Sequence, residues 1–202
     1  NSKIHDAVFK DIYDFYIKSN ESVFPKNYYD LSEQDKFEVL SNVKGALNPD
    51  DFENEITRLT IESIQAIKVI QGNNGELGAN RYIISNNENA LNVMETFALI
   101  RLSDWENPTV DVVPLFESVD DLLNAHNVME QLYTNPVYAN HLVNREMKQT
   151  IMLGFSDGTK DGGYLMANWS IYKAKEELTA ISRKYGIKVI FFDGRGGPPS
   201  RG

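Results

Sequence analysis

Two carboxylates, a lysine and an arginine directly follow three short apolar runs of this sequence. Glu117 follows the run at 110–116, Asp157 and Lys160 follow the run at 150–155, and Arg195 follows the run at 187–192. Two carboxylates without cysteine suit a hard divalent cation such as Mg²⁺ or Mn²⁺, which keeps positions open for water and substrate. A lysine and an arginine beside such a cation suit a phosphorylated or carboxylated anion. This combination could stabilise an enolate or a transferring phosphoryl group.

Arg195 lies in a glycine-rich loop that is typical of an anion-binding site. Gly194, Gly196 and Gly197 allow the backbone to approach a ligand closely, and the guanidinium group offers a planar fork to a phosphate or carboxylate. A disordered Arg-Gly-Gly segment that binds nucleic acid fits poorly, because the loop follows an apolar run and is neither repetitive nor strongly basic.

Each of the other three residues also has a plainer explanation. Glu117 precedes a helix start at Ser118, where an acidic residue is favourable in any case. Asp157 could form a turn with its own backbone in a glycine-rich segment, and Lys160 could be a solvated loop residue. Their convergence at one edge of a sheet is therefore stronger support for a site than any single residue.

The apolar runs alternate with helical patterns, which predicts an α/β fold. The four expected strands lie at 81–85, 110–116, 150–155 and 187–192. Near-continuous apolar strands between helices indicate a parallel sheet that is buried on both faces. We expect about four parallel strands, as half of a doubly wound sheet or, in our preferred reading, a partial (half) β/α barrel. In both folds the active site lies where the strands end.

The amino-terminal third reads as helical. Ile4, Val8 and Ile12 recur at helical spacing, and Ser32 with Asp35 resembles a capping box that opens a second helix. A third helix is expected at about 50–71, with apolar residues that include Ile56 and Leu59 on one face, and a later helix is expected from about Gly163 to Lys184. We therefore divide the chain into a helical segment at 1–78 and a β/α part at 79–202, which form one continuous structure.

The composition limits the classes of function. The chain has 202 residues, 42% of them apolar, a formal net charge of −9 and no cysteine. A broad nucleic-acid surface is not expected, because the phosphate backbone would be repelled, and no apolar run has the length of a membrane span. The sequence starts at Asn1 and stops inside the glycine–arginine loop, so we expect it to be a piece excised from a larger enzyme.

Three segments of the sequence together resemble phosphoenolpyruvate carboxylase. They are PLFESVDDL at 114–122, FSDGTKDGG at 155–163 and FDGRGG at 192–197 with Arg201-Gly202. The segments occur in the order and at about the spacing found in that family. The clear resemblance covers 79–202, and the helical first third occupies the corresponding place.

The resemblance implies a lyase that carboxylates phosphoenolpyruvate with bicarbonate, giving oxaloacetate and phosphate. This is carbon dioxide fixation that replenishes the tricarboxylic acid cycle, by a cytoplasmic homotetramer built around an eight-stranded barrel. By motif position, Glu117 and Asp157 would bind Mg²⁺ or Mn²⁺. Arg195, flanked by Gly196 and Gly197, would hold the substrate phosphate with help from Lys160. Arg201 would hold bicarbonate or carboxyphosphate.

The chain departs from the family pattern at Asp193, where the family usually has histidine. The base histidine of the family would lie upstream of Asn1, so we expect the isolated piece to be inactive. An alternative is another Mg²⁺-dependent enzyme of phosphoenolpyruvate or enolates on a β/α barrel, which would have no reason to carry Arg201. A non-catalytic binding module fits poorly with polar groups clustered at one edge.

Overall fold

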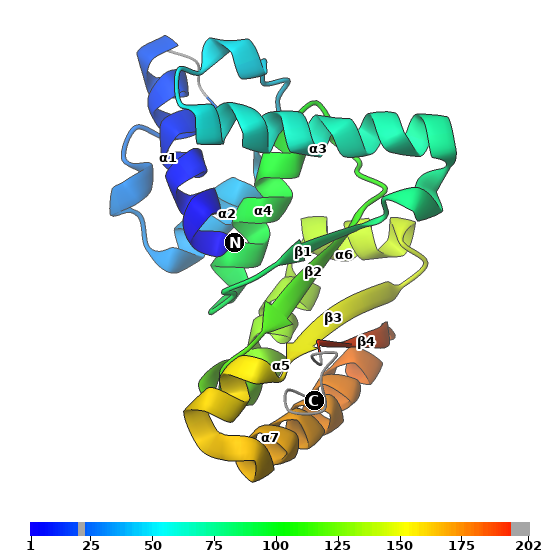
Figure 1. The fold of residues 1–202 in the computed structure, drawn as a ribbon. Coiled ribbons are helices and arrows are strands. Elements are labelled where there is room, and N and C mark those ends of the chain that lie inside the picture. Colours follow the sequence, from blue (N-terminus) through cyan, green and yellow to red (C-terminus); the bar gives the residue numbers. More distant parts are fainter. Residues whose placement is uncertain (20–22, 195–202) are drawn as a thin grey trace. The chain divides into compact units, whose positions relative to one another are not determined.

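The computed structural model describes residues 1–19 and 23–194, and these form a mixed α/β structure (Figure 1). The described part contains one open sheet of four parallel strands and a helical amino-terminal part, which confirms the expected fold class. The elements are α1 (Ser2–Ser19), α2 (Glu33–Asn42), α3 (Glu55–Asn74), β1 (Arg81–Ile84), α4 (Ala90–Leu102), β2 (Asp111–Phe116), α5 (Val119–Thr134), α6 (Pro136–Asn144), β3 (Lys148–Gly154), α7 (Ser156–Lys184) and β4 (Lys188–Gly194), with short 3-10 helices at Tyr28–Asp30, Pro49–Asp51 and Glu76–Gly78.

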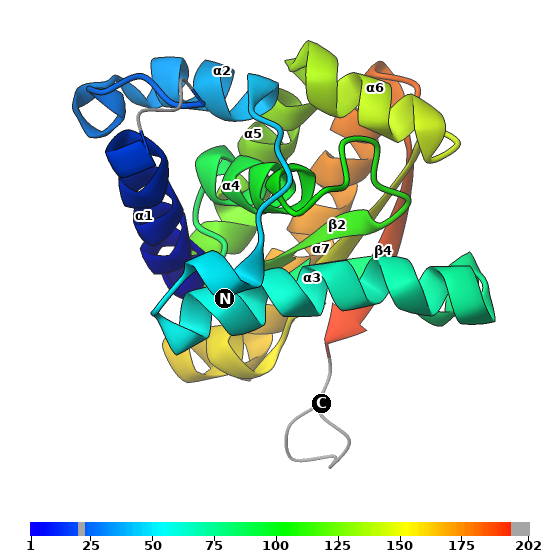
Figure 2. The ribbon, with the colours of Figure 1, turned by 90° about the horizontal axis from the view of Figure 1, so that it is seen from above.

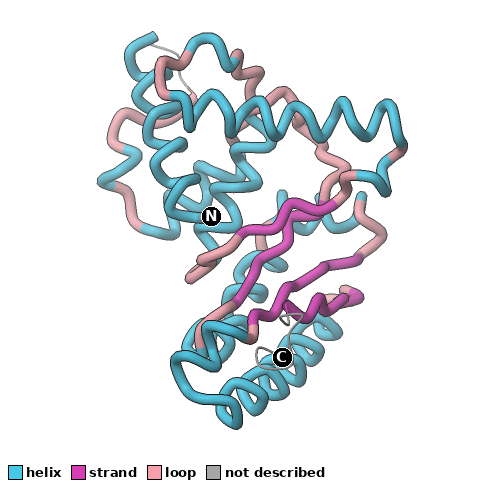
Figure 3. Tube along the Cα trace, viewed as in Figure 1, coloured by secondary structure: helices cyan, strands magenta, loops and turns pink. Residues whose placement is uncertain are grey.

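The strands follow one another across the sheet in chain order, β1–β2–β3–β4 (Figure 1), and appear as the magenta segments of Figure 3. Neighbouring parallel strands need a long crossover, and helices provide it here. The β3–β4 register runs from Lys148 opposite Lys188 to Gly154 opposite Gly194, while Phe116 of β2 lies opposite Leu153. Strands β2, β3 and β4 therefore end at nearly the same level, so that the residues after them share one edge.

The helices α5 and α7 pack side by side in the unit that contains the sheet (Figure 2). The Tyr133 hydroxyl lies 3.1 Å from Ser182 Oγ, which links the two helices through a buried hydrogen bond. Helix α5 begins with a full capping box of Ser118 and Asp121, and this confirms the N-cap expected at Ser118. None of the described helices combines the length and apolar character needed to cross a membrane.

The short helix α6 was not expected from the sequence. Asn135 caps it, since its side-chain oxygen accepts hydrogen bonds from the backbone N–H groups of Val137 and Tyr138. The Tyr138 hydroxyl donates to Gln149 Oε1 at 2.9 Å, and Gln149 Nε2 donates to the Val112 carbonyl at 3.0 Å. This buried network connects α6 to β3 and β2.

The chain divides into two compact units that alternate along the sequence. One consists of Ser2–Arg81 with Leu91–Val110, and the other of Asn1, Tyr82–Ala90 and the chain from Asp111 onward. Helix α4 thus belongs with the amino-terminal helices, although it lies within the expected β/α part. The division at 78/79 stays a prediction about domains.

The helical unit has an aromatic core. The rings of Phe9, Phe24, Tyr28 and Tyr13 lie with centroids 5.2–6.0 Å apart, in tilted and edge-on arrangements. Ser32 caps α2 as expected, because its Oγ atom accepts a hydrogen bond from Asp35 N at 3.2 Å. The expected capping box is only half formed, since Asp35 Oδ2 accepts from Ser32 Oγ and not from the Ser32 backbone N–H.

The expected position and packing of α3 need correction. The helix begins at Glu55 rather than near residue 50, because a 3-10 turn at Pro49–Asp51 precedes it. Within the helix, Thr57, Ile61 and Ile64 are buried. Two residues of the expected apolar face, Ile56 and Leu59, are 57% and 51% exposed.

Helix α4 carries a carboxyl group in an unfavourable environment for charge. Burial, followed by the neighbouring carboxylate of Asp6, raises the pKa of Glu95 well above its usual range. Asn92 and the positive charge of Lys36 act in the opposite direction but are weaker. Glu95 therefore keeps its proton in the folded chain at neutral pH, while the unfolded chain loses it.

We predict that Glu95→Gln becomes increasingly stabilising relative to the parent chain as pH rises. Above pH 4.5 the unfolded state binds fewer protons than the folded state, so the stability of the parent chain falls with rising pH. The difference in unfolding free energy should grow by at least about 1 kcal/mol between pH 5 and pH 8, measured by urea denaturation. The control is Glu130→Gln, because Lys184 lowers the pKa of Glu130 and its effect should stay constant over this range. A constant difference for Glu95→Gln would contradict the prediction.

Candidate functional site

At the carboxyl edge of the sheet, the residue that follows β2 lies beside the end of β3 and the start of α7. A Cβ atom on Gly154 would lie 3.2 Å from Glu117 Cα, 3.2 Å from Glu117 Cγ and 3.3 Å from the Phe116 carbonyl oxygen. A Cβ atom on Gly158 would lie 3.4 Å from the Glu117 carbonyl oxygen. Glycine at position 154 therefore lets Glu117 lie directly beside β3, whereas a Cβ atom on Gly158 would make only an ordinary contact with the Glu117 backbone.

A backbone hydrogen bond holds the Glu117 side chain. Glu117 Oε2 accepts from the backbone N–H of Asn86, which follows β1, at 2.9 Å. Asn86 has a φ of +56°, in the left-handed region, where asparagine is tolerated better than most residues. The turn after β1 thus aims a donor at the carboxylate that follows β2.

Asp157 and Lys160 lie in the first turn of α7 and form an ion pair. Lys160 Nζ donates to Asp157 Oδ1 at 2.7 Å, and the two side chains are 76% and 52% exposed. Such an exposed pair contributes about 1 kcal/mol or less. A divalent cation could therefore displace the lysine from the carboxylate at small cost.

The segment after β3 is helical rather than a loop. The expected helix start near Gly163 is preceded by helical turns from Ser156, and Gly163 itself interrupts the helix with φ of +79° and ψ of 169°. Asp157 consequently lies near a helix amino terminus, where the positive end of the backbone dipole favours a carboxylate.

Asp193, at the end of β4, has a partner that the sequence did not suggest. Lys175 Nζ lies 2.7 Å from Asp193 Oδ1 and 2.9 Å from Oδ2. Lys175 comes from the middle of α7, so only the packing of the helix against β4 brings the two charges together. The ammonium group also lies 5.6 Å from the centre of the Phe191 ring.

The glycine–arginine loop lies outside the described residues. Arg195, Gly196, Gly197 and Arg201 all belong to the segment after Gly194, and their expected roles stay predictions.

The donors at the sheet edge fit Mg²⁺ or Mn²⁺ better than a softer metal. Within residues 1–19 and 23–194, no group of three or more His, Cys, Asp or Glu side chains is placed to hold a metal ion. Zinc sites require three or four protein ligands, whereas Mg²⁺ is commonly held by one or two carboxylates and several waters. Glu117 and Asp157 supply that number of carboxylates.

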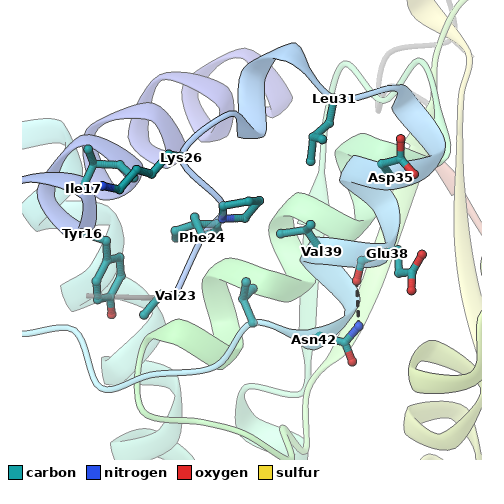
Figure 4. A pocket seen from close by; sticks show the side chains of 12 residues that line it. Tyr16, Ile17, Val23, Phe24, Lys26, Leu31, Asp35, Glu38, Val39 and Asn42 are labelled. Atoms are coloured by element: carbon teal, nitrogen blue, oxygen red, sulfur yellow. Dashed lines mark hydrogen bonds between the residues drawn. The ribbon is translucent and has the colours of Figure 1, made fainter. Parts of the chain in front are cut away.

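The helical unit contains a separate pocket of about 790 Å³ (Figure 4). Apolar side chains of α1, α2 and the segment between them form much of its lining, with Lys26, Asp35 and Glu38 as the charged members. Asp35 also accepts a hydrogen bond from Ser32 Oγ at 2.6 Å, as part of the cap of α2. The pocket contains none of the residues that the sequence indicated for chemistry.

Comparison with known proteins gives the family. A family model described as phosphoenolpyruvate carboxylase matches residues 1–202. The chain belongs to this family. It is 33% identical to the phosphoenolpyruvate carboxylase of Nitrosomonas eutropha and 32% identical to that of Nitrosomonas europaea; each match covers all of this chain and 22% of the relative. The chain thus spans about a fifth of the length of these curated relatives.

Sequence reasoning missed two residues that contact the predicted ones: Asn86, which donates to Glu117, and Lys175, which pairs with Asp193. Asn86 follows the first strand beside Asn87, and an Asn-Asn pair gives no signal for a site because it also occurs in ordinary turns. Lys175 has no local signal, because it lies 18 residues before its partner Asp193.

We predict that Gly154→Ala destabilises the chain by about 1–3 kcal/mol, because the added methyl group would overlap the Glu117 backbone and side chain. The matched control is Gly72→Ala in α3, where a Cβ atom meets nothing within 4 Å. There the substitution should stabilise the helix by about 0.5–1 kcal/mol. Urea denaturation of both variants measures the difference, and equal effects at the two glycines would contradict the close approach at Gly154.

Proposed function

We propose that the chain forms part of the active site of a phosphoenolpyruvate carboxylase. The enzyme would carboxylate phosphoenolpyruvate with bicarbonate to give oxaloacetate and phosphate, as a cytoplasmic homotetramer that replenishes the tricarboxylic acid cycle. The observation that carries this proposal is the position of Glu117, held by Asn86 beside the turn that contains Asp157. Membership of the family supports the choice of substrates.

In this proposal Glu117 and Asp157 hold Mg²⁺ or Mn²⁺ through carboxylate oxygens. The bound cation would stabilise negative charge on the oxygen atoms of the substrate and the enolate. Lys160, once released from Asp157, would be free to bind an anionic oxygen of the substrate. Arg195, with Gly196 and Gly197, would hold the phosphate, and Arg201 would hold bicarbonate or carboxyphosphate.

The proposal also limits what these 202 residues do alone. The chain covers 22% of the length of its relatives, and the upstream base that the family resemblance implies is not among its residues. A polypeptide that contains only part of the active site and lacks the base should not turn over substrate.

We predict no oxaloacetate formation by the 202-residue chain. The assay couples oxaloacetate to malate dehydrogenase and follows NADH oxidation, with phosphoenolpyruvate, bicarbonate and Mg²⁺ present. A full-length relative serves as the positive control. Turnover by the short chain at a rate near that of the relative would show that the described residues already contain a complete site.

We predict that the chain binds Mn²⁺ and that Glu117→Gln and Asp157→Asn each weaken binding by at least about tenfold, since each removes a charged ligand. Electron paramagnetic resonance of free Mn²⁺ gives the dissociation constant. The control is Glu176→Gln, which removes an exposed carboxylate of α7 that pairs with Lys173. The metal assignment fails if Glu117→Gln binds Mn²⁺ as tightly as the parent chain.

A further inference from the structure

Asn87 is a fully buried side chain whose polar atoms are not satisfied by the described chain. It follows Asn86 in the turn between β1 and α4, and its exposed fraction is 0%. Within residues 1–19 and 23–194, neither Nδ2 nor Oδ1 of Asn87 has a hydrogen-bond partner. A buried amide without partners is costly, and protein interiors rarely keep one without a reason.

The position of Asn87 connects it to the carboxylate of Glu117. The backbone N–H of Asn86 lies 2.9 Å from Glu117 Oε2, and consecutive Cα atoms are 3.8 Å apart, so the Asn87 Cα lies within about 8 Å of that oxygen. The Asn87 residue therefore lies close to the carboxylate that, in the proposed function, holds the cation.

The chemistry of the amide suits a hydrated cation with an anionic substrate. Mg²⁺ and Mn²⁺ keep several waters when only one or two carboxylates bind them, and these waters need hydrogen-bond acceptors. The oxygens of a phosphorylated or carboxylated substrate need donors. An asparagine offers one acceptor and two donors, and it adds no charge beside Glu117.

We propose that Asn87 is a further binding residue of the site at the sheet edge. Its Oδ1 atom accepts a hydrogen bond from water on the divalent cation, and its Nδ2 atom donates to an oxygen of the anionic substrate. This inference rests on the function proposed above, because it requires a cation at Glu117. It assigns the unsatisfied amide a role in binding instead of a role in the stability of the free chain.

A structural role would have the opposite signature. If Asn87 stabilised the turn through its side chain, replacing the amide by an apolar group would destabilise the metal-free protein and leave cation affinity unchanged. If the amide serves a ligand, its removal relieves an unsatisfied polar group in the free chain and weakens ligand binding.

The test compares Asn87→Leu, Asn87→Ala and the parent chain in urea denaturation without metal and in Mn²⁺ binding. We expect Asn87→Leu to have an equal or higher urea midpoint and a dissociation constant for Mn²⁺ raised by about tenfold or more. Asn87→Ala removes the amide without adding bulk, so it must show the same loss of affinity even if leucine does not fit.

Thr150→Val is the matched control. Thr150 Oγ1 is another buried polar atom without a partner in the described part of the chain, but Thr150 lies four residues before the end of β3. Its replacement should leave the dissociation constant for Mn²⁺ unchanged, whatever its effect on the urea midpoint.

The outcomes separate this inference from the proposed function. Unchanged Mn²⁺ affinity in both Asn87 variants, together with weaker binding in Glu117→Gln, would overturn the role of Asn87 and leave the metal site standing. A lower urea midpoint with unchanged affinity would assign Asn87 to the turn itself. Unchanged affinity in Glu117→Gln would remove the metal site, and the role of Asn87 with it.

Discussion

The register of the parallel sheet determines which side chains meet at the candidate site. Phe116, Leu153 and Asp193 lie at one level across β2, β3 and β4, so the residues after them project from the same edge. A slip of one residue would exchange the two faces of a strand, and it would move Glu117 away from Gly154. The close approach at Gly154 depends on this register, because a Cβ atom there would lie 3.2 Å from Glu117.

The polar groups at this edge add little to stability, and the hydrogen bonds that stabilise the unit lie elsewhere in it. The Asn87 amide has no hydrogen-bond partner in the described part of the chain, Asn86 adopts a left-handed conformation, and Asp157 lies in an exposed ion pair, so none of them adds much to stability. The buried network of Tyr138 and Gln149 lies near the opposite end of β3, where the Tyr138 hydroxyl donates to Gln149 and Gln149 donates to the Val112 carbonyl. Stability and candidate chemistry thus occupy different ends of the same strands, as expected when a binding site is built on a rigid apolar base.

The sheet could be predicted from the sequence, whereas several packing details could not. The four expected strands match β1 to β4 within a few residues. The expected burial on both faces holds for β2 and β3 only, since β1 has one buried residue, Ile84, and β4 has none. The helical spacing of apolar residues in α3 could be recognised from the sequence. This spacing does not tell which neighbouring element covers the apolar face, and Ile56 and Leu59 are in fact exposed. Helix α6 had a readable signal in Asn135-Pro136, a cap followed by proline at the first helical position. The contacts of Asn86 with Glu117 and of Lys175 with Asp193 join residues that are distant in sequence, and no local pattern encodes them.

The pairing of Lys175 with Asp193 bears on the departure from the family motif. An unpaired aspartate at the end of β4 would repel an anionic substrate at the position where the motif usually has a histidine. Lys175 Nζ approaches both oxygens of Asp193, at 2.7 and 2.9 Å, and so neutralises this charge. The two side chains are 33% and 42% exposed, so their contribution to stability is small after solvent screening. Their effect on the potential at the sheet edge is more important, because the pair removes a net negative charge from an edge that, in the proposed function, must attract phosphoenolpyruvate and bicarbonate.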